Sequence, residues 1–299
     1  ILQEITDKMS SKVRLQYEEN PYPRWVNTGL PLNPSSIYEV TKKLELRIFD
    51  PKINDIENPK ILIGGCGTGQ HSISTAARFT RSEVLAVDLS LASLAYAKRK
   101  TQELGFRNVE YMHADILDLG KLDRKFDIVE SVGVLHHMDD PMEGWKVLSD
   151  CLKPGGLMRI GLYSKLARQN IVKLREEISP SCIGLSDDSM KVFRREIIGS
   201  NKNHHKWILK INDFYSMSEL RDLLFHVQED QFTLPQIQYG LSELGLRFCG
   251  FGTSKIVQNF KLTNTGTDDP YDLDKWDVYE KTNPNIFIGM YQFWCQKEA

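Results

Sequence analysis

Short apolar runs alternate with longer mixed segments along residues 60–163. The runs at 61–63 and within 83–88 place apolar residues at consecutive positions, so both faces of each segment need apolar cover. This pattern is typical of buried parallel strands, and the segments between them are long enough for helices. The alternation predicts βαβ units with right-handed crossovers, and therefore an α/β fold with a doubly wound, mostly parallel sheet.

The same pattern predicts seven strands in all. We expect them within residues 61–64, 83–88, 108–116, 125–138, 152–160, 246–251 and 285–294. Helices are expected at 71–79, 91–104, 141–152 and 233–244, with Pro141 suited to a first turn. Residues 1–20 have helical character, and residues 35–49 favour an amphipathic helix that Ser35 or Ser36 can cap.

The connection between the fifth and sixth strands is far longer than an ordinary loop of an α/β fold. Residues 164–232 are mostly helical in pattern and rich in charge, which predicts a helical cap over the carboxyl edge of the sheet. The predicted organisation is an N-terminal strap or lid at 1–50, a core at 51–163 and 233–299, and the cap at 164–232.

The N-terminal segment mixes aromatic residues and prolines over residues 16–25. Two prolines end any helix there, so an ordered segment that lies across the core is expected. Two interpretations stay open for it. It is either a strap packed on the outside of the core or a lid over a ligand.

Length, charge and hydropathy indicate which kinds of partner to expect for this protein. The 299 residues suffice for one large α/β domain or two modest ones, and the net charge of −2 gives no sign of a general nucleic-acid binder. No apolar run reaches the roughly 18 to 20 residues that cross a bilayer, and no secretory signal is visible. We therefore expect neither nucleic-acid nor membrane partners. The first residue is Ile1 rather than Met, which leaves open a fragment or a trimmed chain with sequence missing upstream.

The five cysteines are scattered and form no C-x-x-C pair or zinc spacing. Such a set is typical of a reducing cytosol, so a cytoplasmic location is expected. The cysteines are Cys66, Cys151, Cys182, Cys249 and Cys295.

The first predicted strand breaks abruptly into Gly64-Gly65-Cys66-Gly67-Thr68-Gly69. Glycines let the backbone turn sharply and approach a ligand closely, and a helix N-terminus follows. The second strand ends in Asp88, where a carboxylate can accept hydrogen bonds from both hydroxyls of a ribose. The spacing is G-x-G-x-G, which lacks the third glycine of the dinucleotide-binding pattern G-x-G-x-x-G.

Together these segments resemble the class I S-adenosylmethionine-dependent methyltransferases. The resemblance extends over residues 60–163 and includes Asp115 after the third strand, residues 125–138 at the fourth, and Lys153-Pro154-Gly155-Gly156 before the fifth. It implies a Rossmann-like sheet whose last strand runs antiparallel, with S-adenosylmethionine as cofactor. The stretch YEENPYPRW at 17–25 and the pattern over 213–235 also resemble bacterial methyltransferase domains that follow tetratricopeptide repeats.

The resemblance implies a role for each motif. The glycines would cradle the methionine part of the cofactor, Asp88 the ribose and Asp115 the adenine amino group, while Ser131 and Val132 would lie under the donor. For Asp88 and Asp115 the alternatives are a helix cap and a turn aspartate, and Cys66 is interpreted as a small residue facing cofactor or core rather than a nucleophile. The expected cofactor-binding residues are Gly64, Gly65, Cys66, Gly67, Gly69, Gln70, Asp88, Leu89, Asp115, Ile116, Ser131 and Val132.

Residues for the acceptor are less constrained by the sequence. Aromatic side chains suit a cationic sulfonium or an amine through cation–π contact, although core packing competes for at least half of them. No metal site is expected at His136-His137, because adjacent histidines usually point apart and no third ligand follows at a suitable spacing. No catalytic base is assigned. The acceptor-site candidates are Tyr17, Tyr22, Trp25, His136, Tyr163, His204 and Tyr215.

The predicted function is therefore methyl transfer from S-adenosylmethionine by in-line displacement, a reaction in which positioning supplies much of the rate. A small molecule is the first expectation for the acceptor, a protein or peptide side chain the second, and RNA the third. Two alternatives stay open, namely a cofactor-binding interaction module without catalysis and another group transfer on the same fold.

Overall fold

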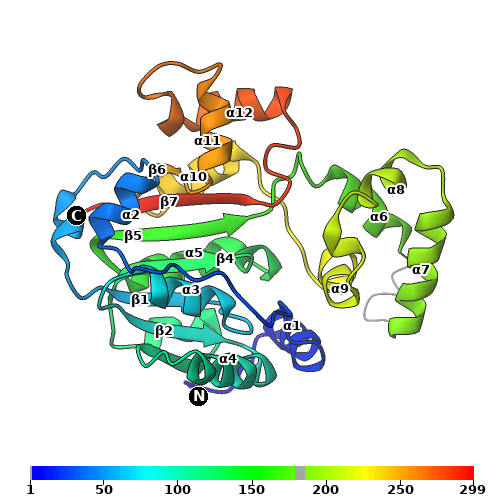
Figure 1. The fold of residues 1–299 in the computed structure, drawn as a ribbon, viewed down its shortest axis with the longest axis horizontal. Helices are drawn as coiled ribbons and strands as arrows, with labels where there is room; N and C mark the ends of the chain where they lie inside the picture. The colour runs from blue at the N-terminus through cyan, green and yellow to red at the C-terminus, as the bar shows by residue number, and fades with distance from the viewer. Residues whose placement is uncertain (1, 179–185) are drawn as a thin grey trace.

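A seven-stranded sheet in the order β3-β2-β1-β4-β5-β7-β6 is the centre of the computed structural model, which describes residues 2–178 and 186–299 (Figure 1). Strands β1 to β5 are parallel, and β7 lies antiparallel between β5 and β6. The predicted sheet and its antiparallel last strand are confirmed. The strands are β1 Lys60–Gly64, β2 Glu83–Asp88, β3 Val109–His113, β4 Phe126–Val132, β5 Leu152–Leu162, β6 Leu246–Phe251 and β7 Tyr291–Lys297.

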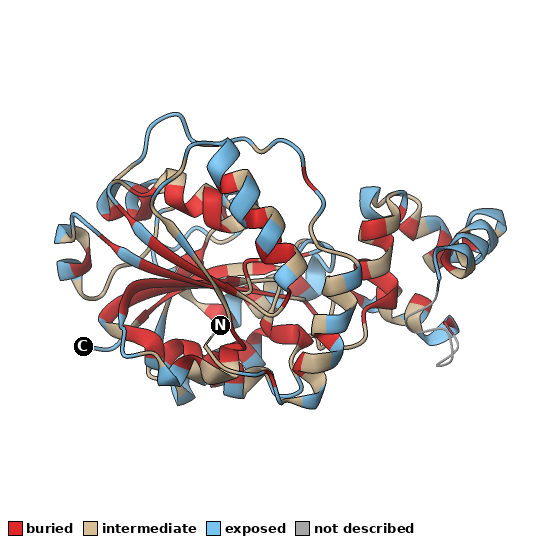
Figure 2. Ribbon diagram, turned by 90° about the horizontal axis from the view of Figure 1, so that it is seen from below, coloured by how far each residue is buried: buried red, intermediate tan, exposed pale blue. Residues whose placement is uncertain are grey.

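Two hydrophobic clusters cover the two faces of this sheet. One contains Trp145, Ile237 and Trp276 from α5, α10 and α12, and the other contains Val40 and Leu94 from α2 and α4. The central strands are buried along most of their length, as the red ribbon in Figure 2 shows, because neither face of the sheet meets water. The helices of this core are α2 Ile37–Lys43, α3 Gln70–Arg78, α4 Leu91–Glu103, α5 Pro141–Cys151, α10 Leu234–Glu243, α11 Ser254–Lys261 and α12 Leu273–Thr282.

Several helices begin at residues that cap them with side-chain oxygens. Ser36 and Thr233 each form a capping box, and Asp140 accepts from the first two N–H groups after Pro141. Such caps satisfy N–H groups that have no partner inside the helix, so the local sequence determines these starting points.

A helical lobe leaves the core after β5 and stands beside the carboxyl edge of the parallel strands (Figure 1). It has its own apolar cluster, which includes Leu174, Ile208 and Phe214. The chain leaves and re-enters the core at one point, where Ser164 and Phe232 form a parallel bridge. The lobe includes α6 Gln169–Glu177, α7 Asp187–Gly199, α8 Asn203–Ile208 and α9 Met217–Phe225. Residues 179–185 of the predicted cap, with Cys182, lie outside the described residues.

The N-terminal helix α1 Lys8–Glu19 lies between the core and the lobe (Figure 1). Its C-terminal end contacts both, because the Tyr17 hydroxyl donates to Asp222 of α9 over 2.9 Å, and the Tyr17 carbonyl accepts from Ser90 at the start of α4. The chain then crosses the glycine turn, where the Thr68 N–H donates to the Tyr22 carbonyl over 3.2 Å. We call residues 20–30 the strap.

Three elements differ from the sequence prediction. The helix expected over residues 35–49 ends at Lys43, because Glu45 adopts a left-handed backbone conformation with φ of 54°. The last strand begins at Tyr291 rather than near residue 285, and turns occupy the positions before it. Helices α11 and α12 between β6 and β7 were not predicted. None of the helices within the described ranges is long and apolar enough to cross a membrane.

Candidate functional site

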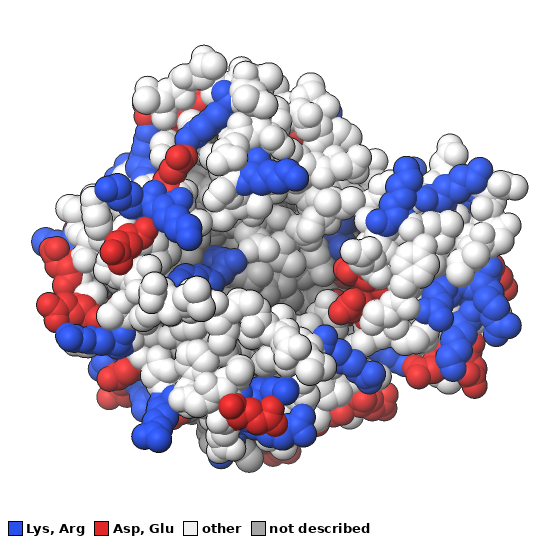
Figure 3. Space-filling view, in the orientation of Figure 1, with Lys and Arg blue, Asp and Glu red and all other residues white. Residues whose placement is uncertain are grey.

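A cavity of about 550 Å³ opens at the carboxyl edge of the sheet. Its walls come from the turn after β1, the ends of β2 and β4, helix α1 with the strap, and α9 of the lobe. Figure 3 shows the surface hollowed between the core and the lobe at this place. Open α/β sheets bind ligands in the crevice at this edge, so the cavity is the candidate site.

The glycine turn needs glycine at two positions for reasons visible in the structure. Gly65 and Gly67 have φ values of 76° and 51°, and a Cβ at Gly65 would lie 2.4 Å from a methyl carbon of Val134. A Cβ at Gly67 would lie 2.5 Å from the Tyr22 carbonyl oxygen of the strap. The turn is therefore pressed between the chain after β4 and the strap, with its backbone facing the cavity.

Asp88 fastens this turn to the tip of β2. One oxygen accepts from the Gly67 N–H over 2.7 Å, and the other accepts from the Ser90 N–H over 2.9 Å. Burial raises the pKa of this carboxyl, against the lowering effect of the two backbone hydrogen bonds. Each carboxylate oxygen has a second lone pair, so the group can still accept from hydroxyls of a ligand.

Asp115 lies further along the same wall of the cavity, after β3. One of its oxygens accepts from the Leu117 N–H over 3.0 Å, and the side chain is 3% exposed. Burial raises the pKa of this carboxyl too. The alternative for Asp115 is present, because its side chain caps the turn Ile116–Lys121, whereas Ser90 rather than Asp88 caps α4. Both acidic side chains also line the cavity.

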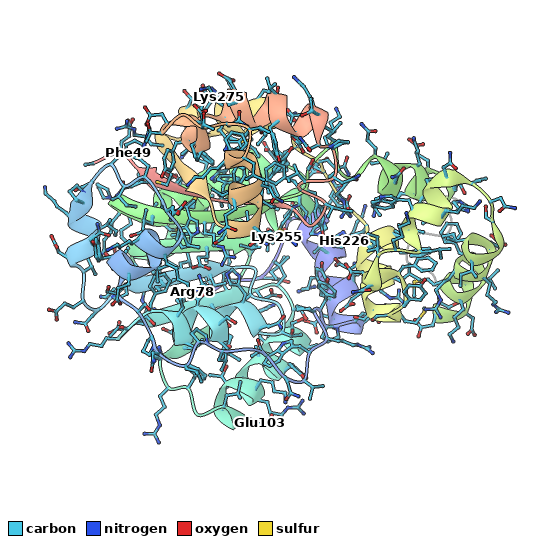
Figure 4. All side chains as sticks on the ribbon, turned by 45° about the horizontal axis from the view of Figure 1, so that its top comes forward. Phe49, Arg78, Glu103, His226, Lys255 and Lys275 are labelled. Atoms are coloured by element: carbon cyan, nitrogen blue, oxygen red, sulfur yellow. The ribbon has the colours of Figure 1, made fainter. Side chains whose placement is uncertain are left out.

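A buried ionic network lies under the floor of the cavity. The Glu130 carboxylate of β4 contacts His71 at 2.6 Å, Arg159 at 3.2 Å and Arg78 at 3.3 Å. Burial raises the pKa of Glu130, but Arg78, His71 and Arg159 outweigh it, so the pKa lies well below its ordinary value. His71, Arg78 and Arg159 line the cavity, and Figure 4 labels Arg78 beside the sheet. Glu130 offsets one of the two positive charges of Arg78 and Arg159, and burial lowers the pKa of His71.

The lobe end of the cavity is aromatic and acidic. Tyr17, Tyr22 and Tyr163 line it together with Asp222, whose side chain is 7% exposed. Among the described residues, the hydroxyls of Tyr22 and Tyr163 form no hydrogen bond, and Asp222 receives one, from Tyr17. Burial raises the pKa of Asp222 from 3.8 to about 6. This end therefore offers a carboxylate and phenol groups to a ligand.

Two histidines pack beside this end. The rings of His137 and His226 stack with centroids 3.6 Å apart, and Figure 4 labels His226 where α1 meets the lobe. His226 Nδ1 accepts from the Gln228 N–H over 3.1 Å, which leaves Nε2 as the donor to Tyr17, 3.1 Å away. Burial lowers the pKa of His137 to about 4, so this ring stays neutral near pH 7.

A buried arginine–glutamate ion pair lies where the lobe joins the core. Arg168 donates to both oxygens of Glu229 over 2.9 and 2.6 Å, a bidentate pair with little exposure. Its guanidinium carbon lies 3.6 Å from the centroid of the Tyr163 ring. The pair holds Tyr163 in the wall of the cavity while its charges compensate each other.

Two groups of side chains have the composition of metal ligands. His137, Asp222 and His226 each place one ligand atom within 4.8 Å of the others, and so do Glu177, His204 and His205 in the lobe. Both His226 nitrogens already form hydrogen bonds, which leaves no free lone pair on that ring. In the second group Glu177 binds both histidines and Lys202, which lower its pKa to about 2 against the effect of burial.

Most residues predicted for the cofactor line the cavity. These are Gly65, Cys66, Gly67, Gln70, Asp88, Leu89, Asp115, Ile116 and Val132. The remaining three, Gly64, Gly69 and Ser131, do not line the cavity. Gly69 is the N-cap residue of α3. The Ser131 hydroxyl donates to the Gly64 carbonyl over 3.0 Å and so joins β4 to β1. Their roles toward a cofactor stay predictions.

Fewer than half of the residues predicted for the acceptor site line the cavity. Tyr17, Tyr22 and Tyr163 line the cavity. Trp25 is buried behind the glycine turn with its indole N–H on Thr68, and His136 is fully buried against Tyr163. His204 binds Glu177 within the lobe, and Tyr215 is 57% exposed with its hydroxyl on the Leu209 carbonyl. These four are therefore not cavity-lining residues in this structure.

Several cavity residues were missed by the sequence analysis. Asp222 lies in the 213–235 pattern and Met290 in the predicted last strand, but neither was named as a site residue. His137 rather than His136 lines the cavity, because the turn Leu135–His137 rotates His136 into the interior. No local pattern distinguishes Asp222 from the other acids of the lobe. The adjacent pair His136-His137 indicated a candidate site residue, but the sequence could not show which of the two histidines lines the cavity.

A family model for a methyltransferase domain matches residues 61–156. An uncharacterized protein of Synechococcus sp. is 28% identical over 254 residues, which cover 77% of this chain and 60% of that protein. The ubiquinone biosynthesis O-methyltransferase of Acinetobacter baumannii (strain AYE) is 29% identical over 114 residues, 38% of this chain and 47% of that enzyme.

Solved structures share the fold. PKMT2 from Rickettsia typhi aligns with 91% of this chain and 55% of its own, at a TM-score of 0.61 and 17% identity. PKMT2 in complex with AdoHcy aligns with 80% of this chain and 48% of its own, at a TM-score of 0.56 and 20% identity. The chain thus spans about 60% of the first relative and about half of PKMT2. The fold class predicted from the sequence is confirmed.

Proposed function

We propose that this chain transfers a methyl group from S-adenosylmethionine to an acceptor held between the sheet and the lobe, through the methyltransferase domain that residues 61–156 form. The domain match confirms the enzyme class and the cofactor predicted from the sequence. The observation that carries the proposal is one shared cavity. The glycine turn, Asp88 and Asp115 form one end of it, and side chains of α1 and the lobe form the other.

In this proposal the cofactor occupies the end nearest the sheet. The Gly65–Gly69 turn receives its methionine part, while Asp88 accepts from the ribose hydroxyls and Asp115 from the adenine amino group. The bound methyl group then points toward the lobe end. Helix α1, the strap and the lobe surround the acceptor and exclude water, and they hold it in line with the sulfonium.

The identity of the acceptor is a separate question, because the names of the similar proteins point to different acceptors. The match to the ubiquinone biosynthesis enzyme covers 38% of this chain, and PKMT2 is similar in fold at 17% identity. A small molecule fits the enclosed cavity best, and a side chain of a protein or peptide is the alternative. The association with tetratricopeptide repeats and the functional division into strap, core and cap also stay predictions.

Replacement of Asp88 by alanine tests the cofactor end. We expect the wild-type protein to bind S-adenosylmethionine in a calorimetric titration and Asp88→Ala to bind at least about 100-fold more weakly, since two charge-assisted hydrogen bonds are lost. Asp123→Ala is the matched control, because Asp123 is an exposed aspartate outside the cavity and should leave the affinity unchanged. Melting curves show whether each variant is folded.

The titration also separates the alternatives. Binding by the wild-type protein that Asp88→Ala loses, followed by methyl transfer from labelled cofactor, supports an enzyme. Binding without transfer to any class of acceptor supports the interaction module. No binding by the folded wild-type protein contradicts the proposal.

A further inference from the structure

We propose that the acceptor is an amine, which Asp222 receives in a cage of Tyr17, Tyr22 and Tyr163 at the lobe end of the cavity. The inference deepens the proposed function and rests on it. It assigns a substrate class to three tyrosines that the sequence analysis named as acceptor candidates and to Asp222, which it did not name, and it follows from the charge and hydrogen bonding of this end of the cavity.

The first observation is the position of Asp222. Asp222 is nine-tenths buried and lines the cavity, and its side chain forms one hydrogen bond with the described residues, in which one of its oxygens accepts from the Tyr17 hydroxyl. Within residues 2–178 and 186–299, no lysine, arginine or histidine forms an ion pair with it. An ionised carboxylate without a cationic partner is costly inside a protein. A cationic ligand would remove that cost.

The second observation is the sign of the charge around the lobe end. Asp213 lies close enough to Tyr22 and Asp222 to raise the pKa of both, and Glu219 lies close enough to raise that of Tyr22. Neither acid forms an ion pair among the described residues. Figure 3 shows acidic side chains on the edge of the lobe beside the hollow. Arg168, a cation whose charge acts on Asp222, is already paired with Glu229. The field at this end therefore favours a positively charged group.

The third observation is the arrangement of aromatic rings. Tyr17 and Tyr22 stack with centroids 6.4 Å apart, and Tyr163 completes the wall beside Asp222. Aromatic faces attract ammonium groups, and the effect grows when water is excluded. The free hydroxyls of Tyr22 and Tyr163 can accept hydrogen bonds from N–H groups. A carboxylate beside three tyrosines thus matches an alkylammonium group in both charge and hydrogen bonding.

The same arrangement fits the chemistry of transfer. The bound ammonium gives one proton to the Asp222 carboxylate, from which it passes to water, and the nitrogen regains its lone pair. That lone pair attacks the methyl carbon, so an N–C bond forms while the S–C bond breaks and the sulfonium becomes a neutral thioether. The product leaves as a methylammonium ion. A neutral hydroxyl acceptor could donate a hydrogen bond to Asp222, but it would gain no attraction between opposite charges there.

Asp222→Asn isolates the charge with little change of shape. The amide oxygen can still accept from Tyr17, and no charge remains to attract an amine. We expect Asp222→Asn to fold with at least the stability of the wild-type protein. Because burial raises the pKa of Asp222 from 3.8 to about 6, its ionised form destabilises the fold above pH 6, and this cost is absent below pH 3.8. Asp188→Asn is the matched control, since Asp188 is an exposed residue of α7 paired with Lys191.

The experiment measures amine binding by calorimetry with protein saturated with S-adenosylhomocysteine. The probes are n-butylamine, a blocked lysine tetrapeptide and n-butanol. We expect one of the two amines to bind the wild-type protein and to accept label from S-adenosylmethionine. Asp222→Asn should reduce kcat/KM for that amine by about 100-fold or more, mainly through KM. Its affinity for the cofactor should stay within about twofold of the wild type, because the cofactor end is unchanged.

The outcomes are distinguishable from failure of the proposed function. If the cofactor does not bind at all, the proposed function fails first. If the cofactor binds but neither amine does, or if the alcohol is methylated instead, the amine proposal is overturned alone. Equal transfer by Asp222→Asn and the wild-type protein would also overturn it. Preference for n-butylamine or for the peptide identifies a free amine or a lysine side chain as the source.

Discussion

Gly67→Ala is expected to abolish binding of S-adenosylmethionine. The residue has φ of 51°, a conformation that costs an alanine about 1–2 kcal/mol. The larger effect is steric, because the new Cβ would lie 2.5 Å from the Tyr22 carbonyl oxygen, and backbone cannot yield as a flexible side chain does. The turn and the strap must therefore separate.

The separation would disturb several contacts at once. The Thr68 N–H donates to that same Tyr22 carbonyl, the Thr68 hydroxyl donates to the Pro23 carbonyl over 2.6 Å, and the Trp25 indole N–H donates to the Thr68 hydroxyl over 3.0 Å. The Gly67 N–H also donates to Asp88. A shift of the turn thus misplaces the carboxylate that we assign to the ribose. We expect affinity to fall by at least about 100-fold, which corresponds to about 2.7 kcal/mol.

Calorimetric titration of Gly67→Ala measures this loss, and Gly120→Ala is the control. A Cβ at Gly120 meets nothing within 4 Å and its φ lies outside the left-handed region, so this variant should bind as the wild type does. If Gly67→Ala bound the cofactor normally, the turn would not be the cofactor site that we propose.

Glu130→Gln is expected to lower the free energy of unfolding by about 3–5 kcal/mol, because it removes the negative partner of a buried ionic network. The carboxylate is fully buried and binds His71, Arg78, Arg159 and the Thr75 hydroxyl. Glutamine keeps the shape but leaves the two guanidinium groups without a counter-charge. Arg159 is more affected than Arg78, since its side chain is 18% exposed and that of Arg78 is 25% exposed.

The effect has a defined dependence on pH. The pKa of Glu130 lies well below its ordinary value of 4.5 in the folded protein. A lowered pKa means that the network contributes its full stability above the unfolded value and loses it as pH falls toward the folded value. The difference between Glu130→Gln and the wild type should therefore be constant above about pH 5 and shrink below about pH 4.

Urea unfolding at pH 7 measures the change, with Glu110→Gln as the control. Glu110 pairs with Arg124 at the surface, both half exposed, and its loss should change stability by no more than about 1 kcal/mol. Equal midpoints for Glu130→Gln and the control would refute the network as a source of stability. A lower midpoint with wild-type cofactor affinity would show that it supports the fold rather than the ligand.

The cofactor end of the cavity was predictable because its parts are local in the chain. Gly65, Gly67 and Asp88 lie at ends of adjacent strands, and the alternating pattern placed those strands correctly. A turn after a buried strand must lie at the edge of the sheet, so its position follows from the strand itself. The same locality explains the success of caps such as Ser36 and of Pro141 in α5.

The predictions that differ from the structure depended on contacts that the local pattern does not contain. The amphipathic pattern over 35–49 continues past the point where Glu45 turns the chain toward β6, and there the Arg47 N–H donates to the Cys249 carbonyl. Trp25 was a candidate because aromatics mark ligand sites, but it packs under the glycine turn against Tyr96. Pattern alone cannot distinguish an aromatic that lines a cavity from one that closes its wall.

The sequence by itself determined the α/β class and the positions of the core strands along the chain, because both follow from periodicity. The turn and the acids that we assign to the cofactor were named from the glycine spacing and from the resemblance to a known class of methyltransferases. Only the tertiary structure decided which residues form the lobe end of the cavity. Tyr17, Tyr163 and Asp222 are distant in the chain, and they meet because α1 and α9 pack against the carboxyl edge of the sheet. Side-chain packing between remote elements leaves no periodic signal in the chain, so the acceptor site becomes visible only in the fold.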